Sequence, residues 1–147
     1  DPARPKLVAA SQKVCDGILK YQDTQSGLWW PVLNQGDRPG NYFEATASSM
    51  FVYALAKGVN RGYLARGDIP AITKGYAGIV NRLIKNDGDA RWSLTHCCSV
   101  AGLGFKNAAG RPRDGSFAYY VSEPVVNNDL KGIGPFILAG IEVQKLN

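Results

Sequence analysis

Apolar residues recur at helical spacing over several segments of the chain. Residues 5–21 carry one apolar stripe, which predicts a first helix (Leu7, Val8, Val14, Cys15, Ile18 and Leu19). A second helix is predicted over 44–61, where small residues come first and bulky apolar residues follow. A third is expected to begin at Asp68, an N-cap residue closely followed by Pro70. Its buried stripe ends before Gly88 (Ile72, Tyr76, Ile79, Val80, Leu83 and Ile84).

The second half of the chain combines short elements with long loops. Residues 90–100 alternate apolar and polar positions in a way that fits a hairpin arm. Residues 116–123 predict a short helix, and Pro135 is placed in the first turn of a final helix. The stretches 27–40 and 102–115 are rich in glycine and proline and are expected to be loops. The pattern predicts one all-α domain of helical hairpins with long loops and at most a short β-hairpin.

Composition excludes several classes of protein without selecting one. The apolar and charged fractions of the 147 residues are ordinary for a folded domain that buries a core. The net charge of +5 comes from scattered lysines and arginines without a basic run, so we expect no nucleic-acid partner. No stretch approaches the roughly 20 apolar residues of a membrane helix, so we expect no membrane association.

The three cysteines do not form a recognisable chemical motif. Cys15 stands alone, while Cys97 and Cys98 are adjacent, a spacing that seldom forms a disulfide. Together with His96 they lack the C-x₂-C spacing with which ligands converge on zinc. We therefore expect buried thiols, no metal site and no cofactor.

Aromatic residues gather in a loop, where water disfavours them unless they pack or bind something. Gly27-Leu28-Trp29-Trp30-Pro31 forms an aromatic-rich turn, and small residues follow at the start of the second predicted helix. Aromatic rings beside a closely approachable helix fit the rim of a carbohydrate-binding cleft. They fit tight helix packing equally well, and spacing alone does not choose between the two.

Several stretches, in order along most of the chain, resemble one family. They are GLWWPV, GNYFEATASSMFVYALAKGVNRGYL, CSVAGLG and RDGSFAYYVSEPVVNNDLKGIGPF. They resemble the unsaturated rhamnogalacturonyl hydrolases and their unsaturated glucuronyl hydrolase relatives, glycoside hydrolase families 105 and 88. The resemblance implies an (α/α)6 barrel, of which this chain, as one domain over 1–147, would be the C-terminal part. Its start at Asp1-Pro2 agrees with a cut inside the barrel.

The resemblance also implies a substrate and a reaction. Family members act on oligosaccharides left by polysaccharide lyases, whose terminal uronic acid carries a C4–C5 double bond. An aspartate acts as general acid and base to hydrate this vinyl ether, and the hemiketal collapses to release the sugar, unlike the two-carboxylate displacement of ordinary glycosidases. The family's aspartate and its main histidine, tryptophan and arginine contacts match no position here, His96 included. No catalytic residue is therefore assigned, and the chain is expected to be inactive alone.

Four residues are predicted to contact the substrate. Trp30 would stack on a sugar ring at the rim, or alternatively plug the end of the barrel. Tyr42 and Glu44 flank a helix N-terminus that would receive a hydroxyl-rich ligand, although Glu44 could instead be an internal cap. Lys131, at the glycine-rich entry to the last helix, would meet a substrate carboxylate, or be a plain surface lysine.

Two other functions stay open at this stage. The chain could be a stand-alone helical carbohydrate-binding or scaffold module, or a helical interaction module without a sugar role. Missing hairpins would also expose apolar stripes, and monomers seldom leave patches above about 600 Å² uncovered. The expected partners are therefore an oligosaccharide with an unsaturated uronic acid, and either the N-terminal half of the barrel or a second copy of this chain.

Overall fold

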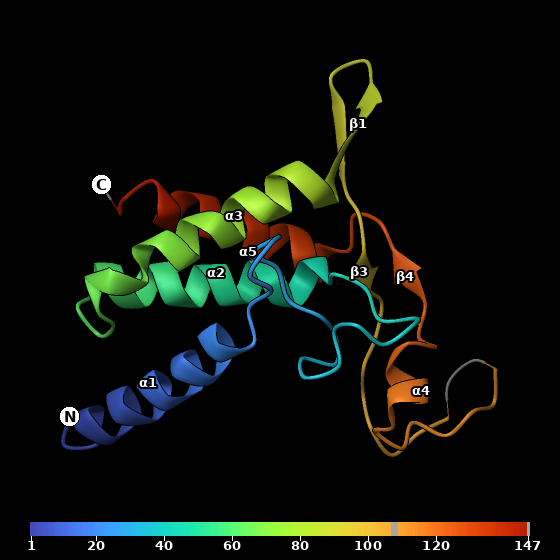
Figure 1. Ribbon diagram of the computed structural model, residues 1–147, viewed down its shortest axis with the longest axis horizontal. Coiled ribbons are helices and arrows are strands. Elements are labelled where there is room, and N and C mark those ends of the chain that lie inside the picture. Colours follow the sequence, from blue (N-terminus) through green and yellow to red (C-terminus); the bar gives the residue numbers. More distant parts are fainter. Residues whose placement is uncertain (107–108, 147) are drawn as a thin grey trace.

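Four long helices form the body of the molecule, which the computed structural model describes over residues 1–106 and 109–146 (Figure 1). They are α1 (Arg4–Lys20), α2 (Ala45–Asn60), α3 (Ile69–Leu83), which follows the 3-10 helix η1 (Arg66–Asp68), and α5 (Leu130–Val143). Successive long helices run in opposite directions, so α2 and α5 are parallel to each other while α1 and α3 run the other way. The predicted all-α class of helical hairpins is confirmed.

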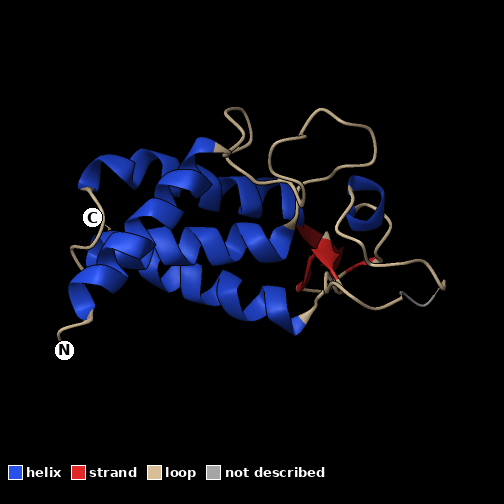
Figure 2. Ribbon diagram, turned by 90° about the horizontal axis from the view of Figure 1, so that it is seen from below, coloured by secondary structure: helices blue, strands red, loops and turns tan. Residues whose placement is uncertain are grey.

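The strands and long loops gather at one end of these helices (Figure 2). β1 (Ile84–Gly88) and β2 (Arg91–Leu94) form an antiparallel hairpin, and β3 (Cys97–Cys98) pairs antiparallel with β4 (Val125–Val126). The one-turn helix α4 (Phe117–Tyr120) lies between β3 and β4 in the chain. Because α2 and α5 both begin at this end, their N-termini face the same cluster of loops.

Helix α2 lies at the centre of the core and contacts α1, α3 and α5. Its first turns are lined by buried small residues, which let α5 approach closely. A Cβ added to Gly132 at the start of α5 would lie 2.9 Å from the Cys97 sulfur and 3.1 Å from the Thr46 hydroxyl oxygen. The small residues of both helices therefore set how near the two N-termini lie.

The loop that precedes α2 is fixed by a buried tryptophan. Trp29 has no exposed surface, and its indole nitrogen donates a hydrogen bond of 2.7 Å to the carbonyl of Ile18 at the end of α1. The same loop lies so close to α3 that a Cβ on Gly78 would collide with the carbonyl oxygen of Ser26. One aromatic side chain thus ties α1 to the start of α2.

Several details differ from the sequence-based expectations. The last helix begins at Leu130, so Pro135 lies inside it rather than in its first turn. The predicted hairpin arm pairs with residues 84–88, which were expected to end the third helix, and the predicted helix over 116–123 is the single turn of α4. The pairing of β3 with β4 was not expected. The cap supplied by Asp129 explains the earlier helix start, because it fixes the first turn upstream of the proline.

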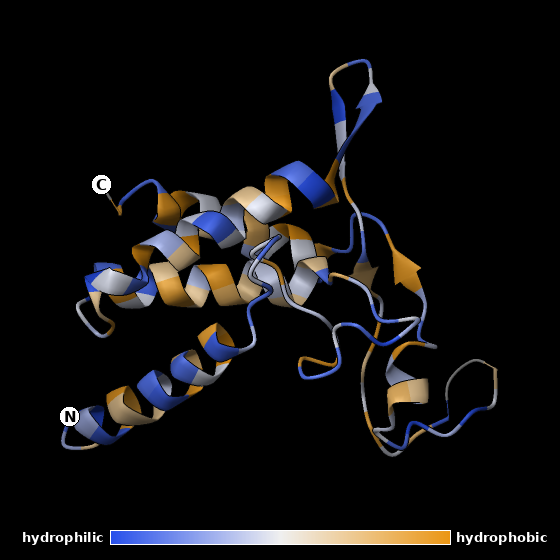
Figure 3. Ribbon diagram, in the orientation of Figure 1, coloured by the Kyte–Doolittle hydropathy of each residue, from blue (hydrophilic) through white to orange (hydrophobic). Residues whose placement is uncertain are grey.

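Not every predicted apolar position is buried. Leu7 and Val14 on α1 are more than 60% exposed, and α5 carries exposed apolar side chains of its own (Leu130, Ile137, Leu138 and Ile141). Figure 3 shows hydrophobic positions along both α2 and α5. We predicted that further hairpins or a second copy of this chain cover such faces, and this stays a prediction. No helix in the described part of the chain is long and apolar enough to cross a membrane.

Candidate functional site

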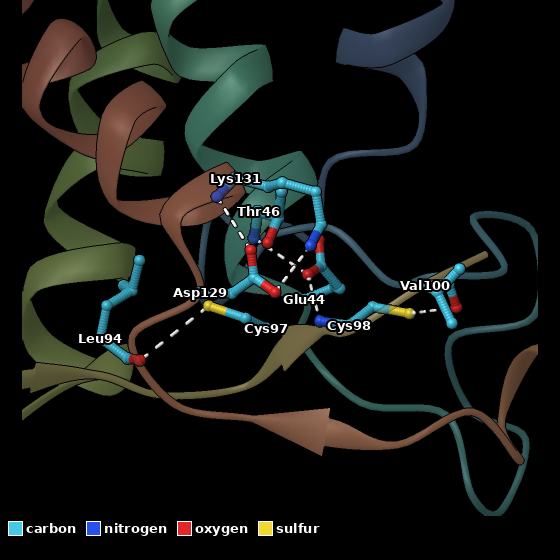
Figure 4. Close-up of polar contacts among 8 residues, drawn as sticks. All are labelled: Glu44, Thr46, Leu94, Cys97, Cys98, Val100, Asp129 and Lys131. Carbon is cyan, nitrogen blue, oxygen red and sulfur yellow. Dashed lines mark hydrogen bonds and ion pairs between the residues drawn. The ribbon is translucent and has the colours of Figure 1, made fainter. Parts of the chain in front are cut away.

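Two helix N-termini lie side by side at the loop end of the molecule. Glu44 caps α2 and Asp129 caps α5, and the start of α5 packs on Thr46 in the first turn of α2. Figure 4 shows these residues together with Cys97, Cys98 and Lys131. Helix N-termini carry amide groups without intrahelical partners and a partial positive charge, and here the carboxylates of Glu44 and Asp129 accept from amides of the two first turns.

The Glu44 carboxylate is buried and accepts hydrogen bonds from three backbone amides. Two of these amides, those of Thr46 and Ala47, belong to the first turn of α2, and the Thr46 bond is 3.0 Å long. The third comes from Cys98 in β3 at 2.8 Å. The side chain is only 4% exposed, so it ties the start of α2 to β3 as an internal cap. Its predicted contact with substrate stays a prediction.

Asp129 and Lys131 form a pair at the start of α5. The Asp129 carboxylate accepts from the Lys131 backbone amide at 2.9 Å and from its ammonium nitrogen at 2.7 Å. These hydrogen bonds from Lys131 lower the pKa of Asp129. Because the Lys131 side chain is 57% exposed, its ammonium group remains accessible to a ligand. The predicted contact of Lys131 with a substrate carboxylate is not tested by this geometry.

Tyr42 is half-buried, and its buried hydroxyl lies at the same end of the molecule. Burial, followed by the neighbouring Cys98 thiol, raises the pKa of Tyr42 well above its ordinary value, so the hydroxyl stays protonated. It lies against that thiol and makes no well-formed hydrogen bond within the described chain. Buried side-chain oxygens of Asn41, Thr46 and Ser49 also lack such a partner. Unpaired buried polar groups are uncommon and are often satisfied by water or a ligand.

Trp30 is half-buried in the loop before α2, unlike its fully buried neighbour Trp29. Its ring packs against Phe43, with 4.0 Å between the ring centroids and a tilt of 32°. A Cβ on Gly36 would lie 2.5 Å from the Trp30 indole nitrogen, so that loop rests on the ring. Trp30 therefore has packing partners and an exposed part, and its predicted sugar contact stays a prediction.

Residues 96–98 belong to this end of the molecule, a position that the sequence analysis does not predict for them. The His96 backbone has a left-handed φ of 60°, its carbonyl accepts from the Ala45 amide at 2.9 Å, and its exposed ring lies 6.4 Å from that of Tyr42. Cys97 packs beneath the start of α5. The contacts of His96 with Tyr42 and Ala45 join residues about fifty positions apart, and no local sequence motif predicts them. Within 1–106 and 109–146, no cluster of three or more potential ligands could hold a metal ion.

The two adjacent thiols are expected to react slowly in the folded chain. Burial is the main cause that raises the pKa of both Cys97 and Cys98, so little thiolate is present at neutral pH. We expect iodoacetamide to modify Cys98 at least about tenfold more slowly in buffer than in urea. Mass spectrometry of timed samples measures both rates. Equal rates in the two solutions would show that the burial assigned to Cys98 is wrong.

Comparison with known proteins gives consistent matches over the whole chain. The family model described as Glycosyl Hydrolase Family 88 matches residues 1–147. Protein Atu3128 of Agrobacterium fabrum and the 24.9 kDa protein in the picA locus of Rhizobium radiobacter are each 38% identical over 146 residues. Each alignment covers 97% of this chain and 61% of the relative, so the chain spans less than two thirds of the length of these curated relatives.

Two solved structures show the same fold. A family 105 glycoside hydrolase of C. acetobutylicum ATCC 824 is 47% identical with a TM-score of 0.82, over 89% of this chain and 35% of that one. A possible member of that family from Klebsiella pneumoniae subsp. pneumoniae MGH 78578 is 24% identical with a TM-score of 0.74, over 100% of this chain and 34% of that one. The likeness confirms the expected fold: the helical hairpins are part of an (α/α)6 barrel.

Proposed function

Because the chain belongs to glycosyl hydrolase family 88, we propose that its loop end binds oligosaccharides that carry a terminal unsaturated uronic acid. The chain would be the C-terminal part of the barrel of a hydrolase that hydrates the C4–C5 double bond of such sugars, of pectin or rhamnogalacturonan type. One observation carries the proposal: the exposed Lys131 and the Tyr42 hydroxyl, which makes no well-formed hydrogen bond within the described residues, both lie at the end of the bundle where α2 and α5 begin.

Each predicted contact has a chemical role in this proposal. Lys131 would pair with the uronate carboxylate through its exposed ammonium, in competition with Asp129, which holds it at 2.7 Å. Tyr42 would donate its protonated hydroxyl to a sugar oxygen, and the exposed part of Trp30 would stack on a sugar ring. Glu44 would mainly hold the start of α2 in place for the ligand, because its carboxylate already accepts three amide hydrogen bonds.

The chain is proposed to supply binding rather than proton transfer. The two carboxylates that cap α2 and α5 are both engaged: Glu44 by backbone amides, and Asp129 by Lys131. A general acid and base needs a carboxyl group within hydrogen-bond reach of the reacting atom and free to exchange a proton. Neither cap carboxylate meets this condition, and the aspartate of the resembled family matches no position of the sequence, so we assign the hydration step to residues outside this chain. The same observation favours a second candidate function, a stand-alone carbohydrate-binding or scaffold module without catalysis.

Replacing Lys131 with glutamine is expected to weaken binding of unsaturated digalacturonate by about fivefold to tenfold. The reason is the loss of one charge-assisted hydrogen bond to the uronate carboxylate. Isothermal titration calorimetry of the 147-residue chain measures the affinity. Lys145 is the matched control, because it is 55% exposed and pairs with Glu142 at 3.1 Å, in the last turns of α5 at the other end of that helix.

The same titration separates the competing functions. The K145Q variant should bind as the unchanged chain does, and Trp30→Ala should bind more weakly than Trp30→Phe, which keeps a ring for stacking. Loss of the double-bond absorbance during the titration would contradict the assignment of hydration to residues outside this chain. Equal affinities of the K131Q variant and the unchanged chain would contradict the proposed role of Lys131.

A further inference from the structure

The β1–β2 hairpin carries an exposed tryptophan beside an open cleft. Trp92 is 62% exposed, and its neighbours along the hairpin are polar or charged. The cleft, of about 620 Å³, is lined by Asp87, Arg91, Trp92, Ser93 and Asn128. The hairpin projects from the end of α3, away from the helices, as Figure 1 shows. The Trp92 ring therefore buries little apolar area within the described chain, and it borders a cleft whose other lining residues are polar or charged.

Three residues that line this cleft, Asp87, Ser93 and Asn128, are connected by hydrogen bonds. The Ser93 hydroxyl donates to the Asp87 carboxylate and accepts from the Asn128 amide nitrogen at 3.0 Å. The Asn128 side-chain oxygen in turn accepts from the backbone amide of Leu94 at 2.9 Å. Asn128 adopts a left-handed φ of 58°, a strained conformation that asparagine tolerates better than most residues. The network holds polar groups in fixed directions beside the Trp92 ring.

Asn128, which lines the cleft, has hydrogen-bonding capacity that these bonds do not use. An asparagine amide has two N–H donors and an oxygen with two lone pairs, and the bonds of Asn128 named above use one donor and one lone pair. Hydrogen bonds from Ser93 and then Lys85 lower the pKa of Asp87, so its carboxylate stays an acceptor. A donor, an acceptor and an aromatic face at one cleft match the hydroxyl groups and the C–H face of a pyranose ring.

Charge decides which sugars fit. Lys85 pairs with Asp87 at 3.0 Å, and Arg91 lies 3.6 Å from Asp89, so the two cations of the hairpin are balanced by two carboxylates. The cleft therefore has no net positive charge to attract a uronate, and the Asp87 carboxylate disfavours one.

We propose that Trp92 and the Asp87–Ser93–Asn128 network form a second saccharide site, which binds a neutral sugar unit. The ring of Trp92 stacks on the sugar, while Asn128 and Asp87 hydrogen-bond its hydroxyls. The site uses none of the four residues assigned to the unsaturated uronate. It rests on the carbohydrate class of the family and not on the unsaturated sugar, so the two proposals fail independently.

The test is calorimetric titration of the 147-residue chain with xylotriose, maltotriose and galactotriose, and with trigalacturonate as the anionic comparison. We expect saturable binding of at least one neutral trisaccharide, with weaker binding of trigalacturonate. Trp92→Ala should lower that affinity by about tenfold or more, the usual loss on truncating an aromatic anchor, whereas Trp92→Phe should stay within about threefold. Phe105→Ala is the matched control, since Phe105 is 74% exposed and lies outside the cleft.

Three results would overturn this site. They are the absence of saturable binding for every neutral trisaccharide, equal affinities of the W92A variant and the unchanged chain, and tighter binding of trigalacturonate than of any neutral sugar. A circular dichroism spectrum of the W92A variant identical to that of the unchanged chain shows that lost binding is not lost folding. The W92A variant should still bind unsaturated digalacturonate, and the K131Q variant should still bind the neutral sugar.

Discussion

Replacing Trp29 with alanine is expected to lower the free energy of unfolding by about 3–5 kcal/mol. The substitution removes a fully buried indole from the core and leaves a cavity between α1 and the start of α2. It also removes the 2.7 Å hydrogen bond from the indole nitrogen to the Ile18 carbonyl, which still accepts from the Tyr21 amide at 3.2 Å. Urea denaturation followed by circular dichroism measures the change.

The neighbouring tryptophan provides the control for this experiment. Trp30 is half-buried and packs mainly on Phe43, so Trp30→Ala should cost about 1–2 kcal/mol, well below the loss at Trp29. The two variants carry the same chemical change at adjacent positions, and only the surroundings differ. A larger loss for Trp30 than for Trp29 would show that the structure assigns the wrong tryptophan to the core.

Replacing Glu44 with alanine is expected to destabilise the chain by about 2–4 kcal/mol. One part is the loss of an N-cap, which usually costs about 1 kcal/mol. The larger part is the partly buried Cys98 amide, which would lose its 2.8 Å hydrogen bond to the Glu44 carboxylate. Glu44→Gln keeps one carbonyl oxygen and should cost less than Glu44→Ala. The midpoints of urea unfolding rank the variants.

Asp129→Ala is the comparison variant for Glu44. Asp129 also caps a helix, but within residues 1–106 and 109–146 its carboxylate bonds only to Lys131 of its own helix. Its loss should therefore be about 1 kcal/mol, as for a simple N-cap. If Glu44→Ala costs no more than Asp129→Ala, the link between α2 and β3 contributes nothing to stability, and Glu44 is free for another role.

The sequence predicts the helices well because their patterns are local. The apolar stripe of α3 and the small residues at the start of α2 repeat at helical spacing. Each helix can therefore be predicted from its own sequence, without knowledge of the elements that pack on it. The end of α3 was misplaced because residues 84–88 form β1 only through pairing with β2. β3 and β4 are two residues each and lie far apart in the chain. Such short strands carry no alternating pattern that a sequence could reveal, so their pairing was not predictable.

The candidate site was predictable only in part, for a similar reason. Glu44 was recognised as a residue at a helix start, because a carboxylate there is favoured by the helix dipole. Its bond to Cys98, and the contact of Cys97 with Gly132, depend on tertiary packing and leave no local trace. Trp29 and Trp30 are adjacent and chemically identical, and only the position of the Ile18 carbonyl separates the core residue from the rim residue.

The central claim is that the loop end of the bundle, including Trp30, receives a terminal unsaturated uronic acid. The most direct measurement is a titration of the nitrogen-15-labelled chain with unsaturated digalacturonate, followed through the indole N–H signals of the three tryptophans. Each signal is assigned by a Trp→Phe variant. We predict that the Trp30 signal shifts in a saturable way while the signal of buried Trp29 stays in place. No shift of the Trp30 signal at saturating sugar, or a shift of the Trp92 signal alone, would contradict the claim.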